Sequence, residues 1–147
     1  MWAVAEVFLQ THAFAPAYAP VSAIREDGAG TLWVGTFGDG LQAVADGKVI
    51  KALTRDDGLK SNFVTDLAPS PAEDALWVAT DRGVSVLKGS KLEAPVPAEA
   101  PDPEEKFVSL YLDSEGVLWA GTMGGGINRL KGALGSGLLH QGPGPVQ

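Results

Sequence analysis

Apolar and polar residues alternate in short runs along most of the chain, and turn-forming residues separate the runs. Residues 21–24 and 48–53 alternate, whereas residues 32–36 combine a Leu-Trp pair with Val, Gly and Thr. A period of two places every second side chain on one face of a β-strand, and clusters of Gly, Asp and Pro between such runs are typical of turns. The pattern therefore predicts many short strands and no long helix.

The runs belong to a longer repeat. The Leu-Trp pair ends at Trp33, Trp77 and Trp119, so it recurs after 44 and then 42 residues. That length accommodates four short strands, and a four-stranded sheet repeated at this interval is typical of one blade of a β-propeller. The sequence predicts an all-β fold with blade repeats at about residues 21–63, 64–107 and 108–131, the fourth strand of the middle copy being weak.

The polar positions of the repeat have structural explanations. In copies one and three, Asp27 and Asp113 stand three residues before a glycine. Aspartate accepts hydrogen bonds from the amides of its own turn, and glycine adopts a positive φ without penalty. A tryptophan that recurs beside a leucine in each blade indicates packing between blades, although an indole can also bind a sugar or an ammonium group. We expect packing for Trp33, Trp77 and Trp119.

With these residues in place, the chain resembles the two-component regulator propeller repeats of the sensor regions of bacterial hybrid histidine kinases. The motif D-x-x-G-x-L-W-x-G-T occupies residues 27–36 and 113–122, and a glycine-rich turn follows each copy. The middle copy departs from it, because residues 70–74 form a longer turn and residues 81–83 a shorter one. The resemblance covers about residues 21–132 and implies a β-propeller that binds or scaffolds rather than catalyses.

Three blades cannot close a ring, because propellers have about four to eight. Residues 2–9 alternate like a strand, and the third copy ends after three strands, so we expect residues 2–9 to complete the last blade. Two chains would supply six blades, which predicts a homodimer. The alternative is that the polypeptide is a piece of a longer propeller. Residues 93–105, with four prolines, are expected to be an extended connector, and residues 132–147 a disordered tail.

Composition narrows the partners and the chemistry. The chain has a net charge of −7, so its field repels phosphate and anionic lipid, and nucleic acid is not an expected partner. No apolar run reaches the length of a membrane helix, and residues 1–15 lack the basic start of a signal peptide. There is no cysteine, and His12 and His140 both lie near the termini, which argues against thiolate or histidine metal centres.

Two kinds of carboxylate-based site are alternatives to a purely structural role of the acidic residues. Six aspartates in or near turns could bind calcium, but they lack the spacing of a calcium-binding loop; they are Asp27, Asp39, Asp56, Asp57, Asp81 and Asp113. Four other carboxylates could converge from different blades for hydrolysis or elimination; they are Glu26, Asp66, Asp74 and Glu115. Residues 124–126 lead into a strand, so they indicate a turn rather than a dinucleotide site.

No residue is therefore assigned as catalytic, metal-binding or cofactor-binding. The sequence favours a non-catalytic module that recognises a small molecule or a protein at the channel mouth or on the loops of one face of the ring. The alternative is a carboxylate-based hydrolase or lyase at the channel mouth.

Overall fold

The computed structural model describes residues 19–93 and 106–131, and the strands of this part of the chain form three antiparallel sheets. The first sheet consists of β1 (Val21–Glu26), β2 (Leu32–Thr36), β3 (Leu41–Ala45) and β4 (Lys48–Leu53). The second consists of β5 (Val64–Ser70), β6 (Ala75–Thr80), β7 (Gly83–Lys88) and β8 (Lys91–Glu93). The third consists of β9 (Phe107–Leu112), β10 (Val117–Thr122) and β11 (Ile127–Lys131).

Each sheet is a meander in which consecutive strands pair. The predicted all-β class and the blade-like sheets are confirmed, and short 3₁₀ turns at Arg55–Asp57 and Pro71–Glu73 are the helical elements of the described residues. No helix in this part of the chain has the length and apolar character needed to cross a membrane. The expected strand at residues 2–9 and the expected tail at 132–147 lie outside the described residues, as does most of the expected connector at 93–105.

The third blade begins at Phe107, one residue before the boundary expected from the sequence. Phe107 pairs with Thr122 beside a bulge, just as Val21 pairs with Thr36 and Val64 with Thr80. The first strands of the blades therefore start at equivalent residues, and the apolar Phe107 occupies the place of the two valines. The alternation after Val108 concealed this offset, because the bulge adds a residue to the strand.

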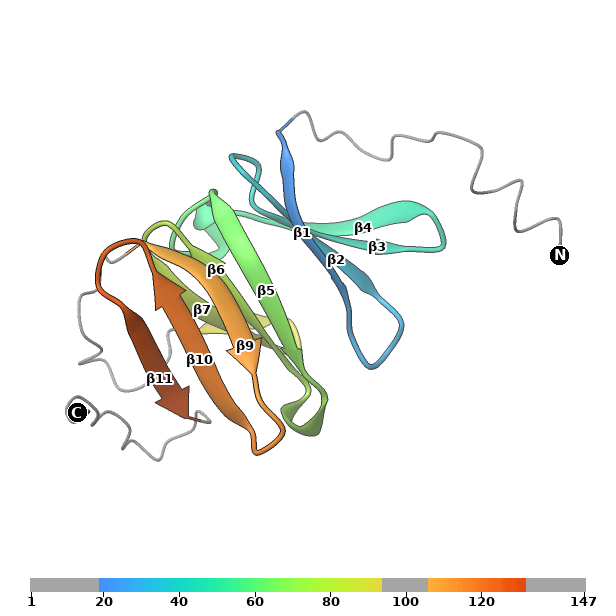
Figure 1. The fold of residues 1–147 in the computed structure, drawn as a ribbon. Coiled ribbons are helices and arrows are strands. Elements are labelled where there is room, and N and C mark those ends of the chain that lie inside the picture. Colours follow the sequence, from blue (N-terminus) through green and yellow to red (C-terminus); the bar gives the residue numbers. More distant parts are fainter. Residues whose placement is uncertain (1–18, 94–105, 132–147) are drawn as a thin grey trace, which may run out of the picture.

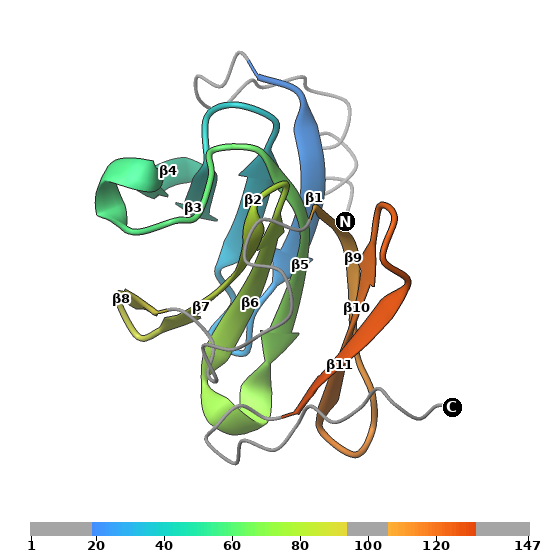
Figure 2. The ribbon, with the colours of Figure 1, turned by 90° about the vertical axis from the view of Figure 1, so that its left-hand side faces the viewer.

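The blades stand face to face around their first strands. Figure 1 shows the three sheets following one another in blue, green and orange, with β5 between β1 and β9. In Figure 2, β1, β5 and β9 are neighbours, whereas β4 and β8 lie far from them. Strand β5 contacts both β1 and β9. The first strand of each blade is thus the inner one, and the last strand is the outer one.

Two hydrophobic clusters join the blades, one at each seam. The first cluster combines Trp33 of the first blade with Leu76 of the second. The second combines Trp77 of the second blade with Leu118 of the third. Adjacent residues of a strand point to opposite faces, so the tryptophan of each Leu-Trp pair faces the next blade and the leucine faces the previous one. The expected packing role of Trp33 and Trp77 is confirmed.

Close approach at the seams depends on small residues in the second strand. A Cβ atom on Gly35 would lie 2.5 Å from Cγ1 of Val64 in the next blade. Ala79 occupies the same position of the second blade and is fully buried against the third.

Hydroxyl groups form hydrogen bonds between the inner strands of neighbouring blades. Ser22 Oγ donates to the carbonyl of Val64 at 2.6 Å, and Thr65 Oγ1 donates to that of Phe107 at 2.7 Å.

The motif aspartate connects its turn to the tryptophan of its own blade. Asp27 Oδ1 accepts from the amides of Ala29 and Thr31, and Oδ2 accepts from Trp33 Nε1 at 2.8 Å. Asp113 repeats this pattern with the amides of Glu115 and Val117, and its bond to Trp119 Nε1 is 3.0 Å long. The expected turn bonds are confirmed, and the indole bond explains why aspartate and tryptophan occur together in copies one and three.

The environment of Asp27 predicts a pH-dependent stability. Partial burial opposes ionisation of Asp27, but the hydrogen bonds from Trp33, Thr31, Ala29 and Gly30 outweigh it and lower its pKa below the ordinary 3.8. A lowered folded-state pKa contributes stability above the unfolded pKa, and this contribution disappears as the pH falls through the folded value. We expect urea unfolding to show that Asp27→Asn is less stable than wild type at pH 7 and that the difference shrinks below about pH 4. A constant difference from pH 7 to pH 3 would contradict this reading.

Candidate functional site

An open hollow lies at the seam of the first two blades, where the β1–β2 turn faces the β5–β6 turn. Its cavity volume is about 520 Å³, within the range of small-molecule sites. Most of the side chains around it are apolar, with Asp27 and Asp74 as the charged ones. The lining residues include Asp27, Trp33, Asp74, Leu76 and Leu87.

The hollow exists where the repeat departs from its motif. Ser70 stands at the position of the motif aspartate, and six residues separate it from Trp77, one more than separate Asp27 from Trp33. The longer turn contains the 3₁₀ segment Pro71–Glu73 and ends at Asp74. Departures from a local rule are expected at functional sites, since the sequence elsewhere follows the rule that stabilises the fold.

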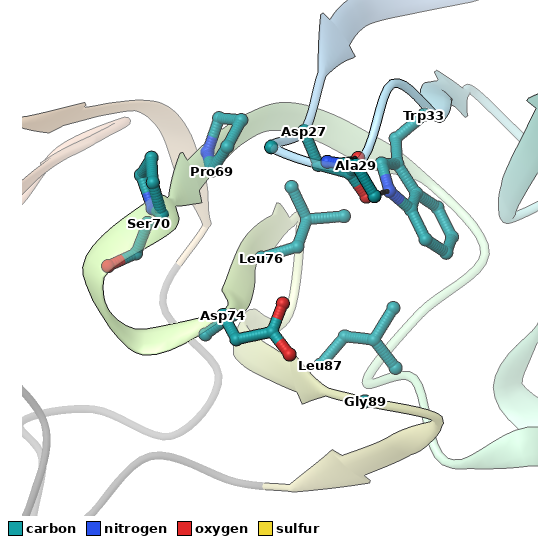
Figure 3. Close-up of a pocket in the computed structure, with 12 residues that line it drawn as sticks. Asp27, Ala29, Trp33, Pro69, Ser70, Asp74, Leu76, Leu87 and Gly89 are labelled. Atoms are coloured by element: carbon teal, nitrogen blue, oxygen red, sulfur yellow. Dashed lines mark hydrogen bonds between the residues drawn. The ribbon is translucent and has the colours of Figure 1, made fainter.

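Asp74 has an unusual backbone conformation. Its φ of 54° lies in the left-handed region, which glycine normally occupies, and its amide donates to the carbonyl of Pro71 at 3.2 Å. Figure 3 shows its carboxylate turned into the hollow toward Leu76 and Leu87, with Trp33 on the other side. The turn thus places an exposed negative charge beside an apolar wall.

The second carboxylate of the hollow, that of Asp27, is less available to a ligand than that of Asp74. Both oxygens of Asp27 accept hydrogen bonds from its own turn and from Trp33 Nε1, and Trp33 is only 8% exposed. Trp33 therefore presents part of an indole that is mostly engaged in packing, so a broad stacking platform for a sugar is not formed. The arrangement is suited to a ligand with an apolar body and one positive charge, which would meet Asp74.

The aspartates considered for calcium are spread over separate turns. Asp27 and Asp113 lie in the β1–β2 and β9–β10 turns, whereas Asp39 and Asp81 lie at the opposite ends of the sheets, in the β2–β3 and β6–β7 turns. Asp56 and Asp57 lie in the 3₁₀ turn after β4, where Asp57 Oδ2 accepts from the amide of the N-cap residue Thr54. Among residues 19–93 and 106–131, no three His, Cys, Asp or Glu side chains come close enough to hold a metal ion.

The four carboxylates considered for catalysis are also separated. Asp66 lies near the start of β5, where it accepts from Arg25 at 3.1 Å, from the amide of Leu110 at 2.8 Å and from the amide of Leu67. It therefore joins all three blades. Glu26 lies on β1, three residues beyond the position equivalent to Asp66. This corresponds to about 10 Å along the strand. Asp74 and Glu115 lie in the turns beyond the strands.

The other end of the blades carries exposed apolar side chains. Phe37, Phe63 and Met123 are 42%, 49% and 66% exposed. Phe37 and Phe63 form an isolated bridge between the first two blades, and the amide of Met123 donates to the carbonyl of Lys106. Phe37 and Met123 follow the second strands of their blades and Phe63 precedes β5, so they mark the loop face opposite the hollow. Sequence reasoning did not single them out, because an exposed apolar residue in a turn has no periodic signal.

Two four-stranded antiparallel meanders and one three-stranded meander, with inner first strands and repeated seams, define a segment of a β-propeller. Residues 17–38 and 102–124 match the family described as two component regulator propeller. This match confirms the resemblance seen in the motif. The matched stretches fall on the first and third copies, which keep the aspartate and tryptophan of the motif, and leave out the divergent middle copy.

Solved structures share the fold at low sequence identity. One is the extracellular domain of a one component system of B. thetaiotaomicron, with 24% identity and a TM-score of 0.64 over 79% of this chain. Another is the extracellular domain of a hybrid two component system of the same organism, with 22% identity and a TM-score of 0.64 over 81% of this chain. Virginiamycin B lyase from Staphylococcus aureus has 18% identity and a TM-score of 0.54 over 80%.

The chain is short beside these structures. It spans 18% and 17% of the two extracellular domains and 43% of the lyase. No curated protein matches it. At these identities the comparison establishes the propeller fold, and the chemistry has to be argued from this chain's own residues.

Proposed function

We propose that the chain is a non-catalytic recognition module that binds a small organic cation in the hollow between the β1–β2 and β5–β6 turns. The observation that carries the proposal is the carboxylate of Asp74, which a left-handed turn directs into an apolar hollow of about 520 Å³. A protonated amine gains an ion pair there, and an attached aromatic or aliphatic group removes its own apolar surface from water against the hollow. Leu76 and Leu87 are each only 3% exposed, so they contribute a preformed wall rather than newly buried surface.

Three features support recognition rather than turnover. The repeats belong to a family described as two component regulator propeller, and two of the structural relatives are extracellular domains of signalling systems. Asp66, the candidate carboxylate on the inner strand β5, already accepts hydrogen bonds from three donors. Within residues 19–93 and 106–131, no three His, Cys, Asp or Glu side chains come together, which favours the binding role over the hydrolase or lyase alternative.

Binding of 2-phenylethylamine tests the proposal. We expect it to bind with a dissociation constant on the order of 1 mM, since so small a ligand gains only a few kcal/mol, and to perturb NMR signals of Asp74, Leu76 and Leu87. The anion 3-phenylpropanoate should bind more weakly. Asp74→Asn should weaken binding of the amine about threefold to fivefold, the magnitude of an ion pair near a surface.

Asp46→Asn is the matched control. Asp46 is exposed, lies in the β3–β4 turn and has a φ of 55°, so the substitution makes the same change of charge in the same backbone conformation. It should leave the affinity unchanged. Equal affinity of wild type and Asp74→Asn for the amine, or an equal loss in both variants, would remove the basis of the proposal.

A further inference from the structure

The outer faces of the two end blades repeat the pattern of the internal seams. On the first blade, Ile24 and Leu32 are 53% and 40% exposed. The residues at the same positions of the second blade are Leu67 and Leu76, and both are buried against the first blade. At each internal seam this surface receives a tryptophan-bearing face. On the first blade it receives none from residues 19–93 and 106–131. We call it the leucine face.

The third blade presents the opposite half of the seam. Trp119 is half-buried and lies on the side of its sheet that the second blade does not cover, since Leu118 is the residue that packs toward the second blade. Its neighbours across the strands are Tyr111 and Arg129, and Arg129 lies 5.8 Å from the centre of the indole. Ile127 on the same side is 64% exposed. We call this surface the tryptophan face.

A gap for a neighbouring blade is present on the tryptophan face. Gly121 pairs with Ile127 in the same register as Gly35 pairs with Leu41. A Cβ on Gly35 would collide with Val64 of the next blade, whereas a Cβ on Gly121 would approach only Ser109 of its own blade. Beside Gly121, no blade of the described part of the chain fills the space that Val64 fills at the first seam.

We propose that the tryptophan face of one copy packs on the leucine face of a second copy, and that two such contacts close a six-bladed ring with a two-fold axis. Two copies give a number of blades within the range of known rings, and both contacts then use the pairing of the internal seams. Blades with these two unlike faces form a closed ring only if the tryptophan face of the last blade meets the leucine face of the first blade. A second copy supplies a partner for both faces. This proposal is independent of the ligand proposed above.

The residues of the seam between copies differ from those of the internal seams. Val108 stands where Ser22 and Thr65 donate hydrogen bonds to the next blade, so this bond is missing. Tyr111 and Arg129 are larger than Ala68 and Val86, which hold the same positions of the second blade. The seam between copies is therefore weaker than the internal seams and separates first on dilution.

The mass of the full chain in solution, measured by light scattering after size exclusion over a range of concentrations, tests the proposal. We expect a species of about twice 15.2 kDa. Gly121→Val should give a monomer, because its side chain would occupy the space of the incoming blade. Leu32→Lys should also give a monomer, because a charge would be buried in the seam. Both positions are on open faces of a single copy, so circular dichroism should show folded monomers with unchanged strand content.

Ser90→Lys is the control for added charge. Ser90 is exposed in the β7–β8 turn of the middle blade, away from both end faces, so this variant should remain dimeric. A wild-type monomer at all concentrations would overturn the proposal and assign the end faces to blades of another polypeptide. Larger open oligomers, or a dimer that survives both Gly121→Val and Leu32→Lys, would also overturn it.

Discussion

Gly35→Val is expected to destabilise the fold by about 3 kcal/mol, the upper part of the range for overpacked interiors. A Cβ at this position would lie 2.5 Å from Cγ1 and 3.2 Å from Cβ of Val64, and 3.3 Å from Ser22 Oγ. None of these atoms can move freely, because Val64 is fully buried and Ser22 donates to its carbonyl. The substitution must push the first two blades apart. Urea unfolding followed by circular dichroism measures the loss.

Gly121→Val is the matched control for this prediction. It places the same side chain at the same register position of the third blade, where only Ser109 Oγ lies within 3 Å of the added Cβ. Measured at a concentration where both proteins are monomeric, its free energy of unfolding should stay within about 1 kcal/mol of wild type. If the two variants lost equal stability, glycine would be needed for its backbone rather than for the approach of the next blade.

Asp27→Ala is expected to cost about 2 kcal/mol, because it removes a charged acceptor and leaves the amides of Ala29 and Thr31 and the indole nitrogen of Trp33 without it. For a folded unit of roughly 100 residues this corresponds to a fall in the melting temperature on the order of 10 °C. Differential scanning calorimetry at pH 7 measures it. The indole is part of the first seam, so the loss affects both the turn and the packing between blades.

A double-mutant cycle separates the two contributions of Asp27. Trp33→Phe removes the indole nitrogen while retaining an aromatic ring in the seam, and Asp27→Ala with Trp33→Phe removes both partners. We expect a coupling of about 1 kcal/mol between the two positions. Additive effects would show that the 2.8 Å bond contributes nothing beyond the turn itself.

The repeats, the hairpins and the seam residues could be predicted because each depends on neighbours in the sequence. Alternation indicates a strand, Asp-x-x-Gly indicates a turn, and a Leu-Trp pair recurring in every copy indicates packing. The direction of that packing could not be predicted. Alternation shows that Trp33 and Leu32 face opposite sides, but only the arrangement of the sheets shows that Trp33 faces the second blade while Leu32 is exposed.

The candidate site was even less visible in the sequence. The longer turn at residues 70–74 was evident, but its consequence depends on Asp74 adopting a positive φ and on the distance to the β1–β2 turn, which is separated from it by more than forty residues. Asp74 was considered only as one of four carboxylates for catalysis. The bond between Asp27 and Trp33 could have been inferred, since Asp113 and Trp119 repeat the same separation while the middle copy has neither the aspartate nor that separation.

The equivalence of the two seams has a genetic consequence. The blades begin at Val21, Val64 and Phe107, so removing or inserting one such unit of coding sequence would join a tryptophan-bearing surface to a leucine-bearing one whichever copy is affected. Recombination within a gene of this kind can therefore change the number of blades without requiring new contacts to evolve. The turn that ends at Asp74 occurs in one unit alone, so the same event either keeps or discards it as a whole.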